Sequence, residues 1–239
     1  MPAAISTTRS RSDLAQGAAK TGAMLREMRS CHWRAAAALL FLLSGCALPG
    51  RESSAFVTQQ IEAAYIPLYK LNFAGGQQAA AVAIAPHLAV TNDHNYGLIP
   101  QKEILARSRD FDLLFFRTDR NFAPPIASPR IGEEVVAYGQ HGRFGRTERR
   151  EADGIIRELD FGLPAHCTDC APQKAISYDA DAGTGFSGGP VVDAKSGALV
   201  GVTVAFADGK GERGGRRMYA FNIDLVIAEM HRLLDEKAR

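Results

Sequence analysis

The sequence predicts an all-β protein that ends in a single helix. Three runs rich in Val and Ile and bounded by Gly have the apolar or alternating pattern of strands, at residues 131–140, 154–159 and 197–206. The last segment, residues 223–237, places Ile, Val, Met and Leu at helical spacing. Three prolines within residues 123–129 break strand pairing, so we expect a linker between two β units there.

Residues 1–45 have the pattern of a bacterial targeting segment. The nine apolar residues 35–43 follow three arginines, and they are too few for a membrane-spanning helix, which needs about 20. Residues 43–46, L-S-G-C, are similar to the lipobox of bacterial lipoproteins. This resemblance implies that Cys46 is lipidated and becomes the first residue of the mature chain.

Removal of residues 1–45 changes the charge of the chain. It takes away six basic and two acidic residues, so the formal charge of +2 becomes about −2, a balance that suggests no nucleic-acid partner. Ala47 after the cysteine favours sorting to the outer membrane, with the protein facing the periplasm of the cell envelope. Translation from Met24 or Met28 would make residues 1–23 an untranslated or disordered extension.

Residues 183–192 read G-T-G-F-S-G-G-P-V-V, a small-residue loop that carries Ser187 into an apolar strand. A serine becomes an effective nucleophile when a base takes its proton and fixed donors meet the oxyanion. Glycines allow the dihedrals that turn successive amides toward one point. The stretch resembles the nucleophile loop of trypsin-like serine proteases, especially their bacterial HtrA/Deg-like branch. The resemblance implies Ser187 as nucleophile and the Gly185 and Ser187 amides as the oxyanion hole.

Six histidines are candidates for the base, and His94 fits best. Two short apolar runs flank Pro86 and His87 and predict a hairpin whose second strand leads to T-N-D-H. The family has T-A-A-H or T-N-A-H at this place, so the resemblance implies His94 as general base. Asp93 replaces the family's alanine, and we expect this acid either to compete for the imidazole or to point to solvent.

An orienting carboxylate is expected at the start of the next apolar run. Eighteen residues after His94, the segment R-D-F-D-L-L-F-F-R resembles the family's D-L-A-L-L strand, with Asp112 beside the apolar run. Such a carboxylate holds the imidazole in one tautomer. Asp110 would share a face with Asp112 on a strand and stays an alternative. The chain order His, Asp, Ser is that of the chymotrypsin arrangement.

The same resemblance implies two six-stranded antiparallel β-barrels packed face to face, with a C-terminal helix. After a linker at residues 46–60, the barrels would span residues 61–122 and 131–222, joined by residues 123–130, with the helix at 223–239.

One position departs from trypsin. The residue before the serine is Phe186, whereas trypsin has an aspartate that pairs with the processed N-terminus. We therefore expect no activation by N-terminal insertion.

Two interpretations of the specificity pocket are open. Asp181 lies six residues before Ser187, where trypsin keeps the aspartate that binds a basic side chain. In contrast, Val204 and Phe206 are expected to line the pocket, and a ring there favours a small or medium apolar side chain before the cleaved bond. We expect the apolar preference.

Cys167 and Cys170 are the two cysteines that follow Cys46. In an oxidising compartment such a close pair predicts a small disulfide. A metal site would need two further ligands, of which His166 is the only obvious one. We expect no cofactor and no metal.

The sequence therefore predicts a serine endopeptidase that cleaves proteins or peptides through an acyl-enzyme. The alternative is a binding or scaffolding lipoprotein that keeps the fold without proteolysis. Three features would support this alternative: Asp93 beside the base, the short loop that precedes Asp112, and the ring of Phe206 in the pocket. An α/β-hydrolase esterase is disfavoured, because its serine lies between a strand and a helix, whereas P-V-V-D and another β-like run follow Ser187.

Overall fold

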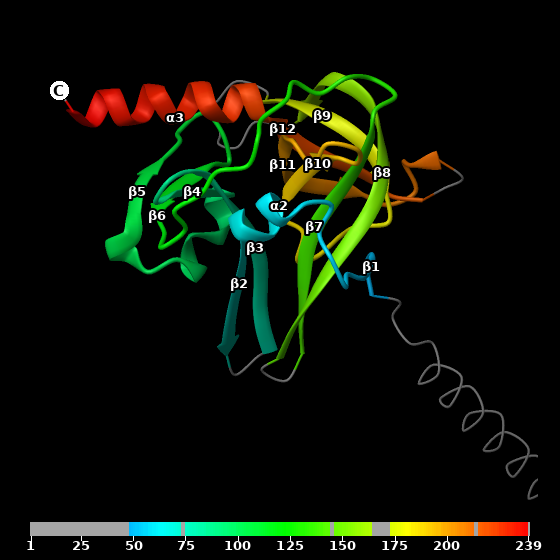
Figure 1. Cartoon of the computed structure of the whole chain (residues 1–239), viewed down its shortest axis with the longest axis horizontal. Coiled ribbons are helices and arrows are strands. Elements are labelled where there is room, and N and C mark those ends of the chain that lie inside the picture. The colour runs from blue at the N-terminus through cyan, green and yellow to red at the C-terminus, as the bar shows by residue number, and fades with distance from the viewer. Residues whose placement is uncertain (1–47, 73–74, 144–145, 164–172, 213–214, 239) are drawn as a thin grey trace, which may run out of the picture. The chain divides into compact units, whose positions relative to one another are not determined.

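The structure is a computed structural model that describes residues 48–72, 75–143, 146–163, 173–212 and 215–238 (Figure 1). Its strands form two antiparallel sheets, and a helix closes the chain, so the predicted all-β class is confirmed. In the described part the sheets have five and seven strands, whereas we expected six in each.

The first sheet has the strand order β2-β3-β4-β6-β5. The turn between β3 and β4 is the hairpin predicted around His87, which has a positive φ of 61°. Its strands are β2 (Tyr65–Asn72), β3 (Gly75–Ala85), β4 (Leu88–Thr91), β5 (Ile104–Arg107) and β6 (Leu114–Arg117). Three short helices accompany it: α2 (Gln59–Ala64), η1 (Asp93–Leu98) and η2 (Gln101–Glu103).

The second sheet has the order β1-β8-β7-β10-β11-β12-β9, and β8 also pairs with β9. The 18-residue β8 makes this possible, because it pairs with β7 along its first part and with β9 along its second. The strands are β1 (Arg51–Glu52), β7 (Glu134–Arg143), β8 (Arg146–Leu163), β9 (Gln173–Ala180), β10 (Pro190–Asp193), β11 (Leu199–Ala207) and β12 (Arg217–Asn222). The seventh strand is the two-residue β1, which lies in the segment expected to be a linker.

The main hydrophobic core joins the two sheets. Figure 1 shows the β2–β3 and β7–β8 hairpins side by side, and β3 contacts β7. Apolar side chains from both sheets are buried together there, so burial of apolar surface holds the two sheets together. Members with almost no exposed surface include Ile61, Val82, Leu113, Phe115, Tyr138, Leu199 and Phe221.

The proline-rich segment between the sheets is attached to β11. The amide of Leu199 donates to the carbonyl of Pro125, and the amide of Ala127 donates to the carbonyl of Leu199. These bonds hold the connection against the second sheet, although its prolines exclude it from regular strand pairing.

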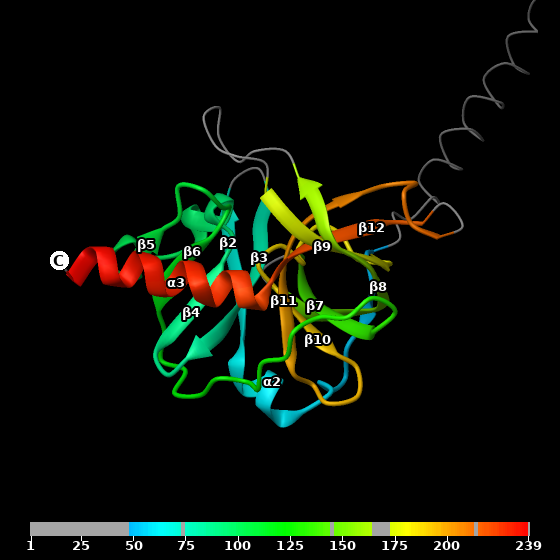
Figure 2. The same ribbon diagram turned by 90° about the horizontal axis from the view of Figure 1, so that it is seen from above.

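The predicted terminal helix is α3 (Ile223–Ala238). It contacts β11 and β12 of the second sheet and β5 of the first, and Figure 2 shows it lying across both groups of strands. No helix in the described part of the chain is both long enough and apolar enough to cross a membrane.

A buried carboxylate on α3 anchors the loop that follows β5. Ser108 donates its hydroxyl to Glu229 at 2.5 Å, and the same hydroxyl accepts from the amides of Asp110 and Phe111. Arg232 donates to both oxygens of Glu229, at 2.6 and 2.7 Å. Burial acts to raise the pKa of Glu229, but the hydrogen bonds from Arg232 and Ser108 outweigh it, so the pKa lies below its usual value.

We expect Glu229→Gln to lower the free energy of unfolding by about 2 kcal/mol at pH 7, because two charge-assisted hydrogen bonds are weakened. A carboxylate with a lowered folded pKa stabilises above its unfolded pKa, and that contribution is lost as the pH falls through the folded value. The difference between the two proteins should therefore shrink below about pH 4. Urea unfolding across this pH range measures it.

Glu236→Gln is the matched control, since Glu236 also binds Arg232 but its side chain is 61% exposed. It should change stability by only a few tenths of a kcal/mol. Equal losses for the two variants would contradict the anchoring role of Glu229.

Candidate active site

The hairpin of β3 and β4 positions His94. β4 ends at Thr91, whose hydroxyl donates to the carbonyl of Ala80 at 2.8 Å, and the chain then turns into η1. His94 therefore leaves the sheet at a fixed point, and its side chain is 47% exposed.

Asp112 lies two residues before the first residue of β6 and holds His94 at two places. One carboxylate oxygen accepts from the backbone amide of His94 at 2.9 Å, and the other lies 2.6 Å from Nδ1 of the ring. The opposite ring nitrogen, Nε2, lies 2.5 Å from the hydroxyl of Ser187. Three residues far apart in sequence thus form one continuous chain of hydrogen bonds.

The two neighbouring acids do not compete for the imidazole. Asp93 is buried and binds Arg107 through both oxygens, at 2.5 and 2.8 Å, so it neither faces solvent nor reaches the ring. Asp110 is largely exposed and lies 3.6 Å from Arg232. Asp112 is therefore the carboxylate that the structure places at His94.

Two asparagines flank the serine, and the sequence analysis missed both. Asn92 is fully buried; its carbonyl oxygen accepts from the Ser187 hydroxyl at 2.7 Å, and its amide donates to the backbone of Asp112. Asn95 donates to Thr91 at 3.0 Å and lies 3.4 Å from the hydroxyl of Ser187. The T-N-D-H-N stretch could have indicated both residues, because its two asparagine side chains follow directly after a buried strand.

The loop around Ser187 needs a glycine at residue 185. Gly185 has a φ of 94°, in the left-handed region, and a Cβ there would collide with the carbonyl of Gln140. The carbonyl of Gly185 accepts from the Gln140 amide at 3.1 Å. Within the described part of the chain, neither the Gly185 amide nor the Ser187 amide donates a hydrogen bond, so both N–H groups are available to an oxyanion.

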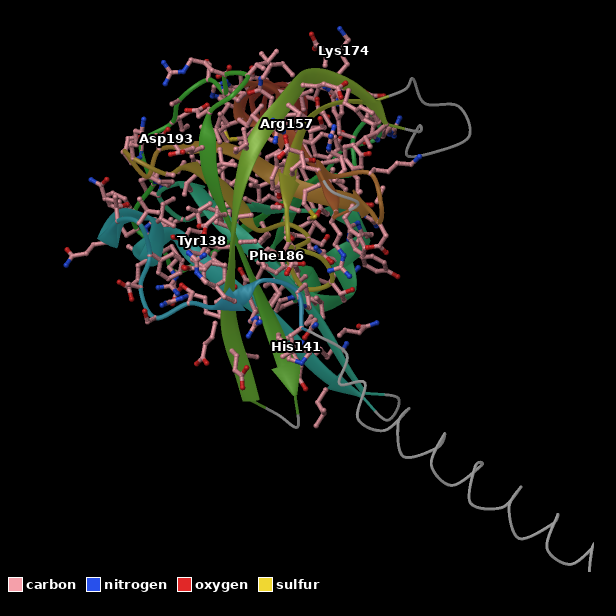
Figure 3. All side chains as sticks on the ribbon, turned by 90° about the vertical axis from the view of Figure 1, so that its right-hand side faces the viewer. Tyr138, His141, Arg157, Lys174, Phe186 and Asp193 are labelled. Atoms are coloured by element: carbon pink, nitrogen blue, oxygen red, sulfur yellow. The ribbon has the colours of Figure 1, made fainter. Side chains whose placement is uncertain are left out.

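The buried side chain of Phe186 anchors the loop that carries Ser187. Its ring is fully buried, and a Cβ added to Gly139 would lie 2.6 Å from it, while one added to Gly50 would lie 2.9 Å away. Figure 3 shows Phe186 near Tyr138 and His141 of β7. Apolar packing against β7 thus fixes the loop at the position where trypsin uses a charged aspartate.

A cavity of about 400 Å³ adjoins Ser187 and His94, and we call it the serine-side cavity. Val204, Ala205, Phe206 and Met218 supply its apolar wall. The expected pocket residue Asp181 is exposed and does not line it. Met218, on β12, occupies the wall instead and was not predicted.

The remaining predicted sites fall outside the described residues. Cys46 precedes the first described residue, and Cys167 and Cys170 lie within residues 164–172. Lipidation and the disulfide therefore stay predictions.

Comparison with solved structures supports the fold. The Rv3671c protease from M. tuberculosis in its active form has a TM-score of 0.59 at 18% identity, covering 74% of this chain and 83% of that one. The HtrA-type protease AlgW with tripeptide gives 0.56 at 21% identity, covering 73% and 61%. The MamO protease domain from Magnetospirillum magneticum gives 0.52 at 16% identity, covering 71% and 96%.

The sequence also matches a protein-family model. No curated protein sequence matches the chain. Residues 72–202, more than half of the chain, match the model described as the trypsin-like peptidase domain, and this range contains His94, Asp112 and Ser187. The chain therefore belongs to the trypsin-like peptidase family.

Proposed function

We propose that this protein is a serine endopeptidase that hydrolyses peptide bonds through an acyl-enzyme. The observation that carries the proposal is the chain of hydrogen bonds from Asp112 through His94 to the hydroxyl of Ser187. In this family, an aspartate bonded to a histidine that is bonded to a serine performs the reaction: the serine attacks the substrate and the histidine transfers the proton.

The steps follow from the geometry. His94 Nε2 takes the proton of Ser187 as the hydroxyl oxygen attacks the substrate carbonyl, and Asp112 stabilises the imidazolium that forms. The amides of Gly185 and Ser187 bind the oxyanion. His94 then donates the proton to the leaving amine, and water repeats the attack on the acyl-enzyme. The Asn92 oxygen lies 2.7 Å from the same hydroxyl and is the alternative acceptor for its single proton, so the attack requires the hydroxyl to donate to Nε2 of His94.

The serine-side cavity supports an apolar side chain before the cleaved bond. Its wall is formed by Val204, Phe206 and Met218, and Met218 is fully buried. Arg216, which stacks over the Phe206 ring at 5.2 Å, is bound to Asp208 at 2.7 Å, so its charge is compensated. A basic side chain would meet no carboxylate among the residues that line this cavity.

We also propose that Cys46 carries a lipid that anchors the protein in the bacterial cell envelope. This proposal rests on the arginines, the nine-residue apolar run and the L-S-G-C sequence described above. Metabolic labelling with a fatty-acid analogue, compared between the full chain and Cys46→Ala, tests it.

A fluorophosphonate probe tests the enzymatic proposal without a known substrate, since it reacts only with an activated serine. The folded full-length chain should be labelled, and Ser187→Ala should not be, although its thermal unfolding is unchanged. Heat-unfolded protein is the control for non-specific reaction. Persistent labelling of the variant would remove Ser187 from its role, and an unlabelled wild-type protein would favour the non-proteolytic scaffold.

A further inference from the structure

A second cavity adjoins His94, and the steps above give it no role. This histidine-side cavity has a volume of about 410 Å³ and is lined by residues 76–78 of β3, residues 94–98 of η1, and Thr184. It shares Gln78, His94, Asn95 and Thr184 with the serine-side cavity but does not include Ser187.

This arrangement defines which part of a substrate the cavity receives, provided that the proposed function holds. The acyl part of the substrate becomes bonded to Ser187 and therefore occupies the cavity that Ser187 lines. The leaving amine takes its proton from His94, so the chain beyond the cleaved bond extends along residues next to His94. The histidine-side cavity is the space that meets this requirement.

The wall of this cavity carries no negative charge. None of the residues that line it is acidic. The acid next to it in sequence, Asp93, is buried and bound by both oxygens to Arg107, whose guanidinium lies 4.9 Å from the ring centre of the lining residue Tyr96. A substrate carboxylate would therefore meet no exposed acid on the cavity wall.

Lys70 supplies a cation at the rim. Its ammonium donates to the carbonyl of the lining residue Gly97 at 3.3 Å, which uses one of its three protons. Lys70 also lies directly opposite Gln77 on the neighbouring strand, so the two exposed side chains share a face of the sheet. Its remaining protons are available at the edge of the cavity.

Gln78 adds a neutral donor at the place where the two cavities meet. Its side-chain oxygen accepts from the amide of Gly142, and its amide nitrogen lies 3.5 Å from Nδ1 of His141, so one of the two N–H protons is left for a ligand. That nitrogen would lie 3.3 Å from a Cβ built on Gly185, beside the loop that carries the nucleophile. The cavity therefore offers an amide donor at its inner end and a cation at its rim.

We propose that the histidine-side cavity selects substrates with Glu or Asp at the first or second position after the cleaved bond, and that Lys70 determines this preference. A carboxylate there accepts a hydrogen bond from the Lys70 ammonium. This inference rests on the proposed endopeptidase function and adds the chemistry of the leaving segment to it.

Cleavage of a degenerate peptide mixture by the full chain, mapped by mass spectrometry, tests the proposal. Two quenched peptides that differ only by Glu or Gln at the enriched position then give a ratio of kcat/KM. We expect Glu to be preferred about three- to fivefold, mainly through KM, as for an exposed ion pair. The ratio should fall to about one for Lys70→Gln and in 1 M salt, and Lys70→Arg should retain it.

Lys195→Gln is the matched control, because it removes the same charge from the turn between β10 and β11 and should keep the wild-type ratio. Equal rates for the two peptides with wild-type protein would overturn the inference and leave the endopeptidase intact. An unchanged preference in Lys70→Gln would remove Lys70 from its role. Failure to cleave any peptide of the mixture would overturn the endopeptidase and this inference together.

Discussion

Asp112→Asn should lower the rate of covalent labelling by a fluorophosphonate about 10⁴-fold at pH 7. The factor is that of the equivalent aspartate-to-asparagine change in the chymotrypsin-type triad. One oxygen of Asp112 accepts from the backbone amide of His94, and the asparagine carbonyl can replace only that oxygen. Its NH₂ group must then face Nδ1, which forces the ring proton onto Nε2. In that tautomer His94 cannot accept the proton of Ser187.

The measurement is the second-order rate constant of labelling for wild-type protein, Asp112→Asn and Asp110→Asn. Asp110→Asn is the matched control, because this acid is two residues away, largely exposed and paired with Arg232. We expect less than a twofold change for it. If Asp110→Asn produced the large loss and Asp112→Asn did not, the orienting acid would have been assigned to the wrong side chain.

The sequence was sufficient for the residues that belong to local motifs. Ser187 and His94 follow from G-F-S-G-G-P and T-N-D-H, because each motif combines a strand end with a turn. The choice between Asp110 and Asp112 could not be made with the same certainty. It depends on a carboxylate that meets a backbone amide 18 residues earlier, and that distance is set by the pairing of β4 with β6.

The parts that the sequence did not predict depend on contacts between distant strands. Asn92 reaches Ser187 across 95 residues of chain, and Met218 enters the pocket wall because β12 pairs with β11. Asp181 was placed in the pocket by counting residues from the serine, but that count does not specify which residues line the cavity. The five and seven strands also follow from tertiary pairing, since the two residues of β1 carry no strand pattern.

Phe186→Ala should lower the free energy of unfolding by about 4 kcal/mol, as expected when a fully buried aromatic side chain is removed. The melting temperature should fall by roughly 10 °C for a domain of this size. Labelling at Ser187 should slow as well, because the ring holds the loop that presents the Gly185 and Ser187 amides. Phe122→Ala is the matched control: this ring is 38% exposed, and its loss should change stability by about 0.5 kcal/mol or less.

A double-mutant cycle with Gly139 identifies the contact responsible. A Cβ at this residue would lie 2.6 Å from the Phe186 ring, so Gly139→Ala should destabilise the wild-type protein. In the Phe186→Ala background the ring is absent, but the same Cβ would still lie 2.7 Å from the backbone Cα of residue 186. We therefore expect Gly139→Ala to remain destabilising there but to cost less than in the wild-type protein, with a coupling energy of about 1–3 kcal/mol measured by urea unfolding. An equal cost in both backgrounds would mean that β7 excludes a side chain at residue 139 for a reason other than the anchoring ring.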